Sequence, residues 1–399
     1  MYSAGRHAAL TSSAWSAQAA RAAIQEIVTD AATRFDARRF WPAHPLDEQA
    51  PNGSTGLYWG AIGVIWAMDF LRREGAADHG LDFTPVLPEL LEANRREFAA
   101  VASMAGIEPR RASYLFGDVP ALLLMMRVAS DAGVADELHR RIEENLDLPL
   151  LEIMWGAAGT MLTCVFAAEM TREDRWRNLY LAQARRLLAD LEETDGGPLW
   201  TQNLYGKTRQ FLGPVHGYAG NMQALIRGWP WLSDAEQARV KGAVSSTLSM
   251  NVLRGEMGAN WPALATGETQ PERVQYCHGA PGMVTVFAAR AVADPNLMPL
   301  LEEGARLTWG AGPLAKGSNL CHGTGGNGYA FLKLFDLTGE PVWLERARAF
   351  AMTAIDQFRA ASAQYGQGRY SLWTGDIGLA VYLHECIISS ARFPTVDVF

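Results

Sequence analysis

The chain has 399 residues, of which 49% are hydrophobic and 10% aromatic, so it can bury a large core instead of staying disordered. Its net charge of −8 without a Lys/Arg cluster argues against nucleic acid and anionic membranes as main partners. With no long apolar run and no apolar core of a signal peptide near Met1, we expect a soluble, cytoplasmic protein without a transmembrane segment.

A repeated glycine pattern organises the sequence. Seven apolar segments each follow a glycine, and six of them carry a second glycine three positions later, whereas the second segment has Pro120 there. The first glycines are Gly60, Gly117, Gly156, Gly217, Gly279, Gly323 and Gly375. Because each segment is apolar nearly all round for about three turns, the pattern predicts seven buried inner helices.

Amphipathic segments with a 3.6-residue period alternate with these apolar ones and predict seven outer helices. They cover residues 19–35, 83–101, 135–146, 172–193, 234–248, 296–309 and 342–358. We see no β signal in the series. The prediction is therefore an all-α protein, an α/α toroid of seven inner and seven outer helices in one domain over 1–399. An open solenoid is the alternative, but its concave face is less apolar than these inner helices.

If the inner helices run parallel, the glycines at which they start all lie at one end of the toroid. The residues that precede these glycines then line one shared depression at that end, here called the bowl. Helix N-termini bring free N–H groups and partial positive charge, which favour anions and thiolates. Three consecutive repeats place His216, Cys277-His278 and Cys321-His322 directly before the glycine. The chain has eight histidines and four cysteines, and these three histidines and two cysteines are thus expected in the bowl.

Thiolate and imidazole are ligands of Zn²⁺. Cys277 and Cys321, with one or both of His322 and His278, can supply a tetrahedral site, which is catalytic with three protein ligands and structural with four. We prefer two cysteines and one histidine, because Cys321 and His322 are adjacent and Cys277 lies on the neighbouring helix. Small buried cysteines with capping histidines are the alternative, which two identical tripeptides in register make unattractive.

The remaining two cysteines differ from this pair in their surroundings. Cys164 in GTMLTCVFAA and Cys386 in AVYLHECII lie inside apolar helices. We expect both of them, and His384 beside Cys386, to be part of the core.

In these motifs the sequence resembles the lanthionine synthetase C-like family over essentially its whole length. The resemblance is carried by the seven glycine-paired helices, by Cys-His-Gly in the fifth and sixth, and by HGYAG in the fourth. It implies one Zn²⁺ per chain bound by Cys277, Cys321 and His322, with the last position open to water or a substrate thiol. It also implies that His216 is the acid/base residue.

Two branches of the family differ in the thiol they use. Bacterial cyclases add peptide cysteines to dehydroalanine or dehydrobutyrine and close thioether rings, whereas the other branch adds glutathione to such residues in proteins. The runs QYCHGAPG, LAKGSNLCHG and YGK, and the pair Gly117-Asp118, resemble the glutathione branch. Pro120 and a loose match at Arg6 depart from the family pattern. Glutathione transfer is the prediction and lanthipeptide cyclisation the alternative.

The chemistry assigns roles to further residues. Zinc deprotonates a bound thiol, attack at Cβ leaves an enolate, and His216 is expected to protonate Cα. Glu152, four residues before Gly156, is expected to orient this histidine, with helix capping as the alternative.

A negatively charged thiol calls for cations near the bowl, and we expect Lys316 and Arg369 to bind it. Asp118 and His278 complete the predicted substrate-binding set. For His278 a hydrogen bond to a ligand or the enolate and a purely structural role both remain open.

Two rival classes remain. A glycoside-processing α/α toroid would need two carboxylates across a cleft, taken from Asp118, Glu152 and Asp376. A zinc-bound scaffold that binds a peptide without catalysis would keep its activity after replacement of His216. Zinc content tests the first alternative, and a His216 variant tests the second.

Overall fold

The computed structural model describes residues 2–47, 50, 52–106, 110–129, 132–148, 150–265 and 273–399. The chain divides into two units, here called the middle unit (residues 1–3 and 98–310) and the terminal unit (residues 4–97 and 311–399). Each contains its own set of fully buried apolar side chains. The single domain expected over 1–399 stays a prediction.

The even-numbered helices correspond to the predicted inner helices. Within the described residues they are α2 (Ala61–Arg73), α4 (Val119–Ala129), α6 (Ala157–Thr171), α8 (Tyr218–Arg227), α10 (Ala280–Phe287), α12 (Thr324–Thr338) and α14 (Asp376–Ile388). All but α4 have the first glycine of a repeat as the residue before the helix. In the described ranges, no helix combines the length and the apolarity that a membrane span needs.

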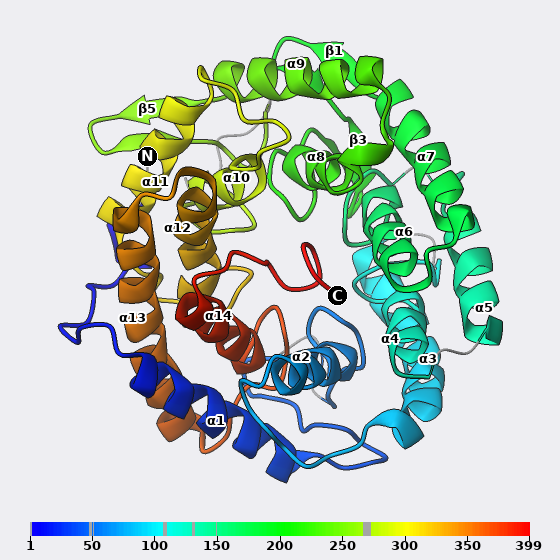
Figure 1. Cartoon of the computed structure of the whole chain (residues 1–399), viewed down its shortest axis with the longest axis vertical. Helices are drawn as coiled ribbons and strands as arrows, with labels where there is room; N and C mark the ends of the chain where they lie inside the picture. Colours follow the sequence, from blue (N-terminus) through cyan, green and yellow to red (C-terminus); the bar gives the residue numbers. More distant parts are fainter. Residues whose placement is uncertain are drawn as a thin grey trace. The chain divides into compact units, whose positions relative to one another are not determined.

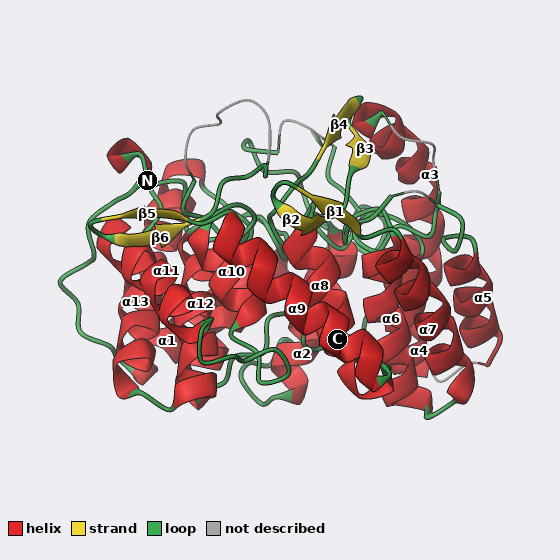
Figure 2. Ribbon diagram, turned by 90° about the horizontal axis from the view of Figure 1, so that it is seen from above, coloured by secondary structure: helices red, strands yellow, loops and turns green. Residues whose placement is uncertain are grey.

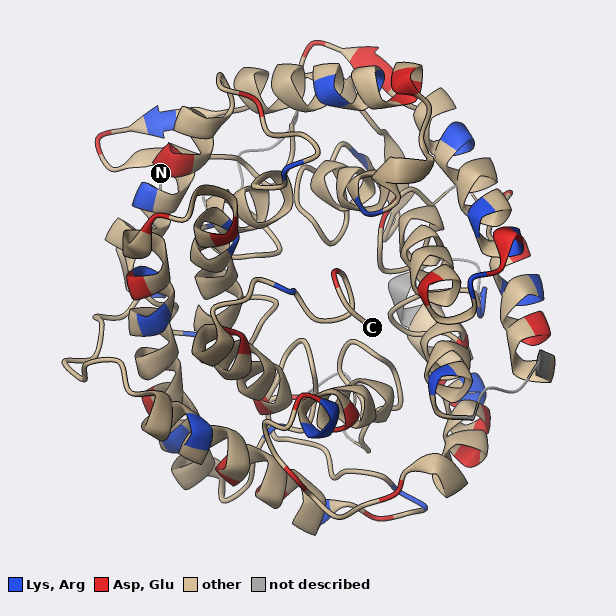
Figure 3. Cartoon of the chain, in the orientation of Figure 1, with Lys and Arg blue, Asp and Glu red and all other residues tan. Residues whose placement is uncertain are grey.

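The odd-numbered helices correspond to the predicted outer helices. They are α1 (Ala17–Arg34), α3 (Leu87–Ala105), α5 (Ala132–Glu143), α7 (Asp174–Ala189), α9 (Asp234–Met250), α11 (Met298–Ala311) and α13 (Pro341–Tyr365). In the middle unit α7 packs beside α6, and in the terminal unit α13 packs beside α12 and α1 beside α14 (Figure 1). Figure 3 shows charged residues spaced along α7, as expected for an amphipathic helix with one face in water.

Short 3₁₀-helices complete the helical elements of the described chain. They are η1 (Ala4–Arg6), η2 (Thr84–Val86) and η3 (Trp229–Trp231).

The prediction that no strand interrupts the helices was wrong. The described residues include three antiparallel hairpins, β1 (Glu192–Thr194) with β2 (Gly197–Leu199), β3 (Gln202–Leu204) with β4 (Lys207–Arg209), and β5 (Leu253–Gly255) with β6 (Gly258–Asn260). Three residues per strand are too few to show an alternating pattern in a sequence. All three hairpins lie at one end of the middle unit's helices, the end at which α8 and α10 begin (Figure 2).

The glycine that precedes an even-numbered helix is required by close backbone contact. At Gly156 a side chain would collide with the carbonyl oxygen of Leu150. At Gly279 the collision would be with the carbonyl oxygen of Arg273, and the φ of +112° is also unfavourable for other residues. The repeated glycines therefore let the chain double back closely before each helix, which fixes the residues next to them in place.

Candidate functional site

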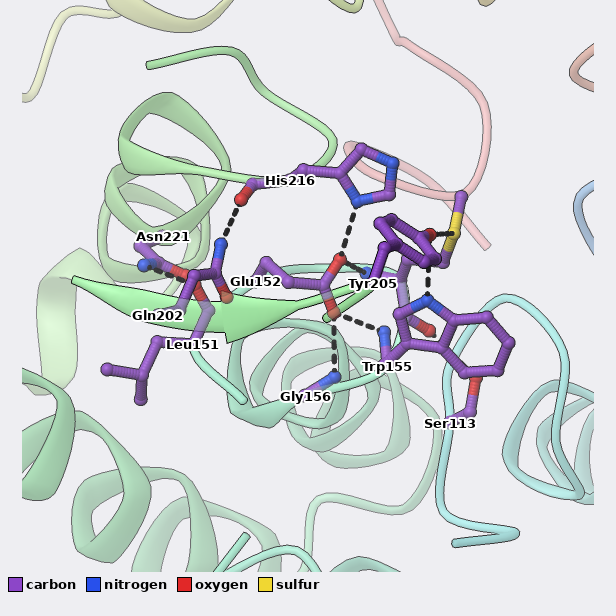
Figure 4. A network of polar contacts seen from close by, with 10 residues as sticks. Ser113, Leu151, Glu152, Trp155, Gly156, Gln202, Tyr205, His216 and Asn221 are labelled. Carbon is purple, nitrogen blue, oxygen red and sulfur yellow. Dashed lines mark hydrogen bonds and ion pairs between the residues drawn. The ribbon is translucent and has the colours of Figure 1, made fainter. Parts of the chain in front are cut away.

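His216 and Glu152 meet in the middle unit, where α8 and α6 begin (Figure 4). His216 directly precedes Gly217, and Glu152 stands four residues before Gly156. The Nδ1 atom of His216 lies 3.3 Å from Oε2 of Glu152. The Glu152 side chain is fully buried, whereas that of His216 is 19% exposed. The structure thus brings together the predicted acid/base residue and the residue predicted to orient it.

Glu152 also caps helix α6, so the two roles considered for it coexist. Its carboxylate accepts backbone N–H groups from Met154 at 2.9 Å, from Trp155, and from Gly156 at 3.1 Å. These donors fix the carboxylate rigidly. An ionised carboxylate only accepts hydrogen bonds, so Nδ1 of His216 carries a proton and Nε2 is left for a ligand.

The β3–β4 hairpin also contacts His216, through Gln202 and Tyr205. Gln202 on β3 donates from Nε2 to the main-chain oxygen of His216, and the Tyr205 ring packs edge-to-face on the imidazole with centroids 5.5 Å apart at 90°. The Trp155 indole N–H donates to the Tyr205 hydroxyl at 3.2 Å. Sequence reasoning used Tyr205 only as part of a family resemblance and missed Gln202. Gly206, which suits a turn position with positive φ, is the available signal for this hairpin.

Cys277 belongs to the middle unit and lies just before α10. It is buried, and its sulfur accepts a hydrogen bond from Gln275 Nε2 at 2.9 Å. Next to it, His278 has an Nδ1 without a hydrogen-bond partner among the described residues. Burial lowers the pKa of His278 to about 3, helped by the charges of His216 and Arg273, so this imidazole is neutral.

Cys321 and His322 belong to the terminal unit and lie just before α12. The sulfur of the buried Cys321 accepts a hydrogen bond from the Tyr58 hydroxyl at 2.9 Å. The backbone N–H of His322 donates to Asn319 Oδ1 at 3.1 Å. The role of Tyr58 and Gln275 as donors to the two sulfurs was not predicted from the sequence.

The donor set fits a zinc ion. Two cysteines and a histidine are a ligand combination of open zinc sites, and thiolates are the form that binds. The hydrogen bonds from Tyr58 and Gln275 suit sulfur atoms that carry negative charge, as expected around ligating groups. The chemistry of Cys277, Cys321 and His322 therefore agrees with the predicted metal.

A cavity of about 420 Å³ lies in the terminal unit beside His322. Lys316 and Arg369, both predicted to bind substrate, line it together with Tyr58. Lys316 is exposed and forms no ion pair with any described residue. Arg369 instead pairs with Asp47, which also lines the cavity, at 2.7 Å between Nη2 and Oδ1. Lys316 is thus the cation that a ligand can neutralise here without displacing a carboxylate.

Asp118, also predicted to bind substrate, has a fully buried side chain in the middle unit. Its Oδ2 lies 3.2 Å from Nε of Arg141 on α5. A buried carboxylate paired with Arg is expected to be structural, because breaking the pair would leave a charge without compensation. Its role in substrate binding stays a prediction. Asp118 and Glu152 both have fully buried side chains, and Glu152 is also engaged in capping α6. These observations argue against Asp118 and Glu152 as the two carboxylates of a glycoside-processing cleft.

Asp376 begins α14 in the terminal unit. Its Oδ2 accepts the backbone N–H of Arg369 at 2.7 Å. Burial raises the pKa of Asp376 from its ordinary value of 3.8 to about 6. This carboxyl therefore changes charge near neutral pH and holds the backbone of a cavity residue.

The predicted core residues lie as expected. Cys164 and Cys386 are fully buried within α6 and α14. His384 is buried as well, with Nε2 at 3.5 Å from Glu74.

Comparison with known proteins gives one family and several relatives. The family model described as "Lanthionine synthetase C-like protein" matches residues 9–398. "Glutathione S-transferase LANCL1" of Danio rerio is 26% identical over 266 residues, 62% of each chain. "LanC-like protein GCL1" of Arabidopsis thaliana is 34% identical over 197 residues, 47% of this chain and 44% of that protein. The matches thus span less than two thirds of the length of these curated relatives.

A solved structure, "Nisin cyclase", resembles this chain with a TM-score of 0.58 at 14% identity, over 86% of this chain and 94% of that chain. This likeness, with the family match, confirms the predicted fold class, an all-α protein of the α/α toroid type. Since the family model covers the chain almost from end to end, the protein belongs to the lanthionine synthetase C-like family.

Proposed function

We propose that this protein catalyses the zinc-dependent addition of a thiol, glutathione in the first place, to dehydroalanine or dehydrobutyrine residues of a peptide or protein, forming a thioether. The observation that carries the proposal is the contact of His216 Nδ1 with the buried Glu152 carboxylate. It holds an imidazole whose other nitrogen is available to move a proton. The glutathione transferase name of a relative is in line with the choice of thiol.

Cys277, Cys321 and His322 are the proposed ligands of one Zn²⁺ per chain. When bound, the metal keeps a substrate thiol deprotonated at neutral pH, where a free thiol is mostly protonated. Gln275 and Tyr58 donate to the two cysteine sulfurs and so orient these ligands. The cysteines lie next to helix N-termini, where partial positive charge favours thiolates.

His216 is the proposed general acid. The new S–Cβ bond leaves an enolate, and Nε2 of His216 delivers a proton to Cα. Glu152 keeps the proton on Nδ1 in place and stabilises the charge of the protonated imidazole, because it is an anion held by three backbone N–H groups. Its burial excludes water from this contact.

Lys316 is the proposed contact for the negative charge of glutathione, since it lines the cavity beside His322 without an ion pair in the described residues. Arg369 supplies a second positive group, partly neutralised by Asp47. The other substrate is then the dehydroamino acid of a peptide or protein. Ring closure within one peptide is the alternative reaction of the same residues.

The test incubates zinc-loaded protein with glutathione and a dehydroalanine peptide and follows the adduct by mass. We expect adduct with the wild type, a loss of about 100-fold to 1,000-fold in rate for His216→Ala, and no adduct for Cys321→Ala. A second peptide that carries its own cysteine distinguishes ring closure from transfer of glutathione.

His139→Ala is the matched control, because His139 on α5 also contacts a glutamate, Glu143, at 3.6 Å, but lies in a predicted outer helix. This variant should keep wild-type activity. Absence of adduct with every thiol, or equal rates in the wild type and in both site variants, would contradict the proposal.

A further inference from the structure

The turn of the β3–β4 hairpin is built on an unusual residue. Tyr205 and Gly206 connect the strands with φ values of +54° and +70°. A two-residue turn with positive φ at both positions favours Asn-Gly, because Asn tolerates this conformation far better than a bulky aromatic residue. Strain of this kind collects at functional sites. The side chain of Tyr205 should therefore have a use that outweighs the strain.

The Tyr205 hydroxyl is held beside His216 but is weakly satisfied as a donor. It accepts the Trp155 indole N–H at 3.2 Å and points its own proton at the thioether sulfur of Met154, 3.7 Å away (Figure 4). A thioether is a poor acceptor. A carbonyl or enolate oxygen that enters the site can thus take over this hydrogen bond, while Trp155 keeps the phenol in position.

The same hairpin fixes the geometry between the two rings. Gln202 holds the main chain of His216, and Tyr205 packs against its imidazole. Tyr205 is 42% exposed as a residue, so a substrate can reach it, yet burial of the hydroxyl against its neighbours raises its pKa above the ordinary value of 10. The phenol therefore stays protonated at neutral pH and acts only as a donor.

We propose that Tyr205 is a catalytic residue, whose hydroxyl donates a hydrogen bond to the carbonyl oxygen of the dehydroamino acid and stabilises the enolate. The inference rests on the proposed thiol addition. In the step the thiol sulfur bonds to Cβ, the Cα=Cβ electron pair moves toward the carbonyl carbon, and the carbonyl π pair moves onto oxygen. His216 then protonates Cα, the carbonyl reforms, the proton lost by the thiol restores His216, and Tyr205 keeps its own proton.

The first test variant is Tyr205→Phe, which keeps the ring and removes the donor. We expect kcat for addition of glutathione to a dehydroalanine peptide to fall about 100-fold, as for loss of one oxyanion donor. The exchange of the Cα hydrogen of the thioether product in D₂O, which passes through the same enolate, should slow equally. Zinc content should not change, and the thermal midpoint should fall by no more than the loss of the single hydrogen bond from Trp155 explains.

A second variant separates catalysis from hairpin stability. Tyr205→Asn gives the turn its preferred residue, so the thermal midpoint should rise while kcat falls as in Tyr205→Phe. Thr208→Ala, at an exposed position of β4, is the control on the same hairpin and should match the wild type in both.

Three outcomes would overturn this inference. In the first, Tyr205→Phe matches the wild type in kcat and in exchange, which leaves thiol addition itself standing. In the second, both Tyr205 variants lower the thermal midpoint together with the activity, which assigns Tyr205 a structural role. In the third, the wild type forms no adduct, so that the proposed function fails and this inference with it.

Discussion

Cysteine and histidine have different surroundings at the starts of the even-numbered helices and in their interiors. Cys277 and Cys321, just before α10 and α12, each have a side-chain donor 2.9 Å from sulfur. Cys164 and Cys386, inside α6 and α14, are enclosed, and burial raises the pKa of the Cys386 thiol to about 12 and that of Cys164 still further. Cys164 does accept a hydrogen bond from Gln183 Nε2, but at a longer 3.6 Å. Position in the helix, and the burial that comes with it, thus separates cysteines suited to a metal from those enclosed in the core.

Histidine follows the same division. His216, at the start of α8, is partly exposed and keeps one ring nitrogen for a ligand, whereas His384, inside α14, is buried against Glu74. At the helix starts the chain doubles back closely, and the first N–H groups donate to the preceding loop, as Tyr218 does to the carbonyl oxygen of Phe211 at 2.8 Å, whereas the interiors have only regular helical bonds. We therefore expect substitutions at the starts to change metal binding, proton transfer or titration, and substitutions in the interiors to change only packing.

The largest effect is expected for Cys277→Ala compared with Cys164→Ala. The first removes a proposed zinc ligand, so zinc content should fall below one per chain and the rate of adduct formation at least about 1,000-fold. The second should keep zinc and rate and only lower the thermal midpoint. Metal analysis and the adduct assay check both. Full zinc content in Cys277→Ala would contradict the assignment of Cys277 as a ligand and the contrast with Cys164.

Asp376 tests whether a polar group buried at a helix start costs stability. Because its pKa is raised from 3.8 to about 6, the folded state binds the proton more tightly than the unfolded state. This contribution to stability is fully present below about pH 4 and is lost as pH rises through about 6. Asp376→Asn should therefore gain about 3 kcal/mol in unfolding free energy relative to the wild type between pH 4 and pH 7.

Denaturant titrations at several pH values measure this difference. Asp195→Asn, at an exposed position of the turn between β1 and β2, is the control and should follow the wild type at every pH. A constant difference between Asp376→Asn and the wild type across the range would contradict the expectation.

Glu152→Gln sharpens the role of the pair at the start of α8. The amide is close in shape to the carboxylate but cannot stabilise a protonated His216, so kcat should fall about 30-fold, less than for loss of the acid itself. Zinc content should be unchanged. Glu143→Gln removes the carboxylate beside His139 on α5 and should have no effect on kcat. Equal rates for the two variants would remove Glu152 from the mechanism.

The smallest effect is expected for Lys316→Met. Loss of a charged contact in the cavity should raise KM for glutathione about 10-fold and leave kcat unchanged. A neutral thiol such as 2-mercaptoethanol should show no difference. Lys241→Met on α9, a predicted outer helix, is the control. If KM for the neutral thiol rises as much as KM for glutathione, Lys316 does not bind the negative charge of glutathione.

Most of the helical framework was predictable because its signals are local. The first glycine of a repeat marks the start of nearly every even-numbered helix in the described chain, and the 3.6-residue period marks the odd-numbered ones. The hairpins were not predicted because strands of three residues are too short to show an alternating apolar pattern. With them the roles of Gln202 and Tyr205 were missed, since a residue in a short turn gives no sign of what it will contact.

The sequence by itself determined which residues stand at the helix starts, because glycine placement and apolar periodicity act between near neighbours in the chain. Only the tertiary structure decided their partners. Glu152 reaches His216 across 64 residues, and Asp47 reaches Arg369 across 322. Such contacts depend on how the folded backbone brings distant segments within hydrogen-bonding distance, and no local pattern encodes that.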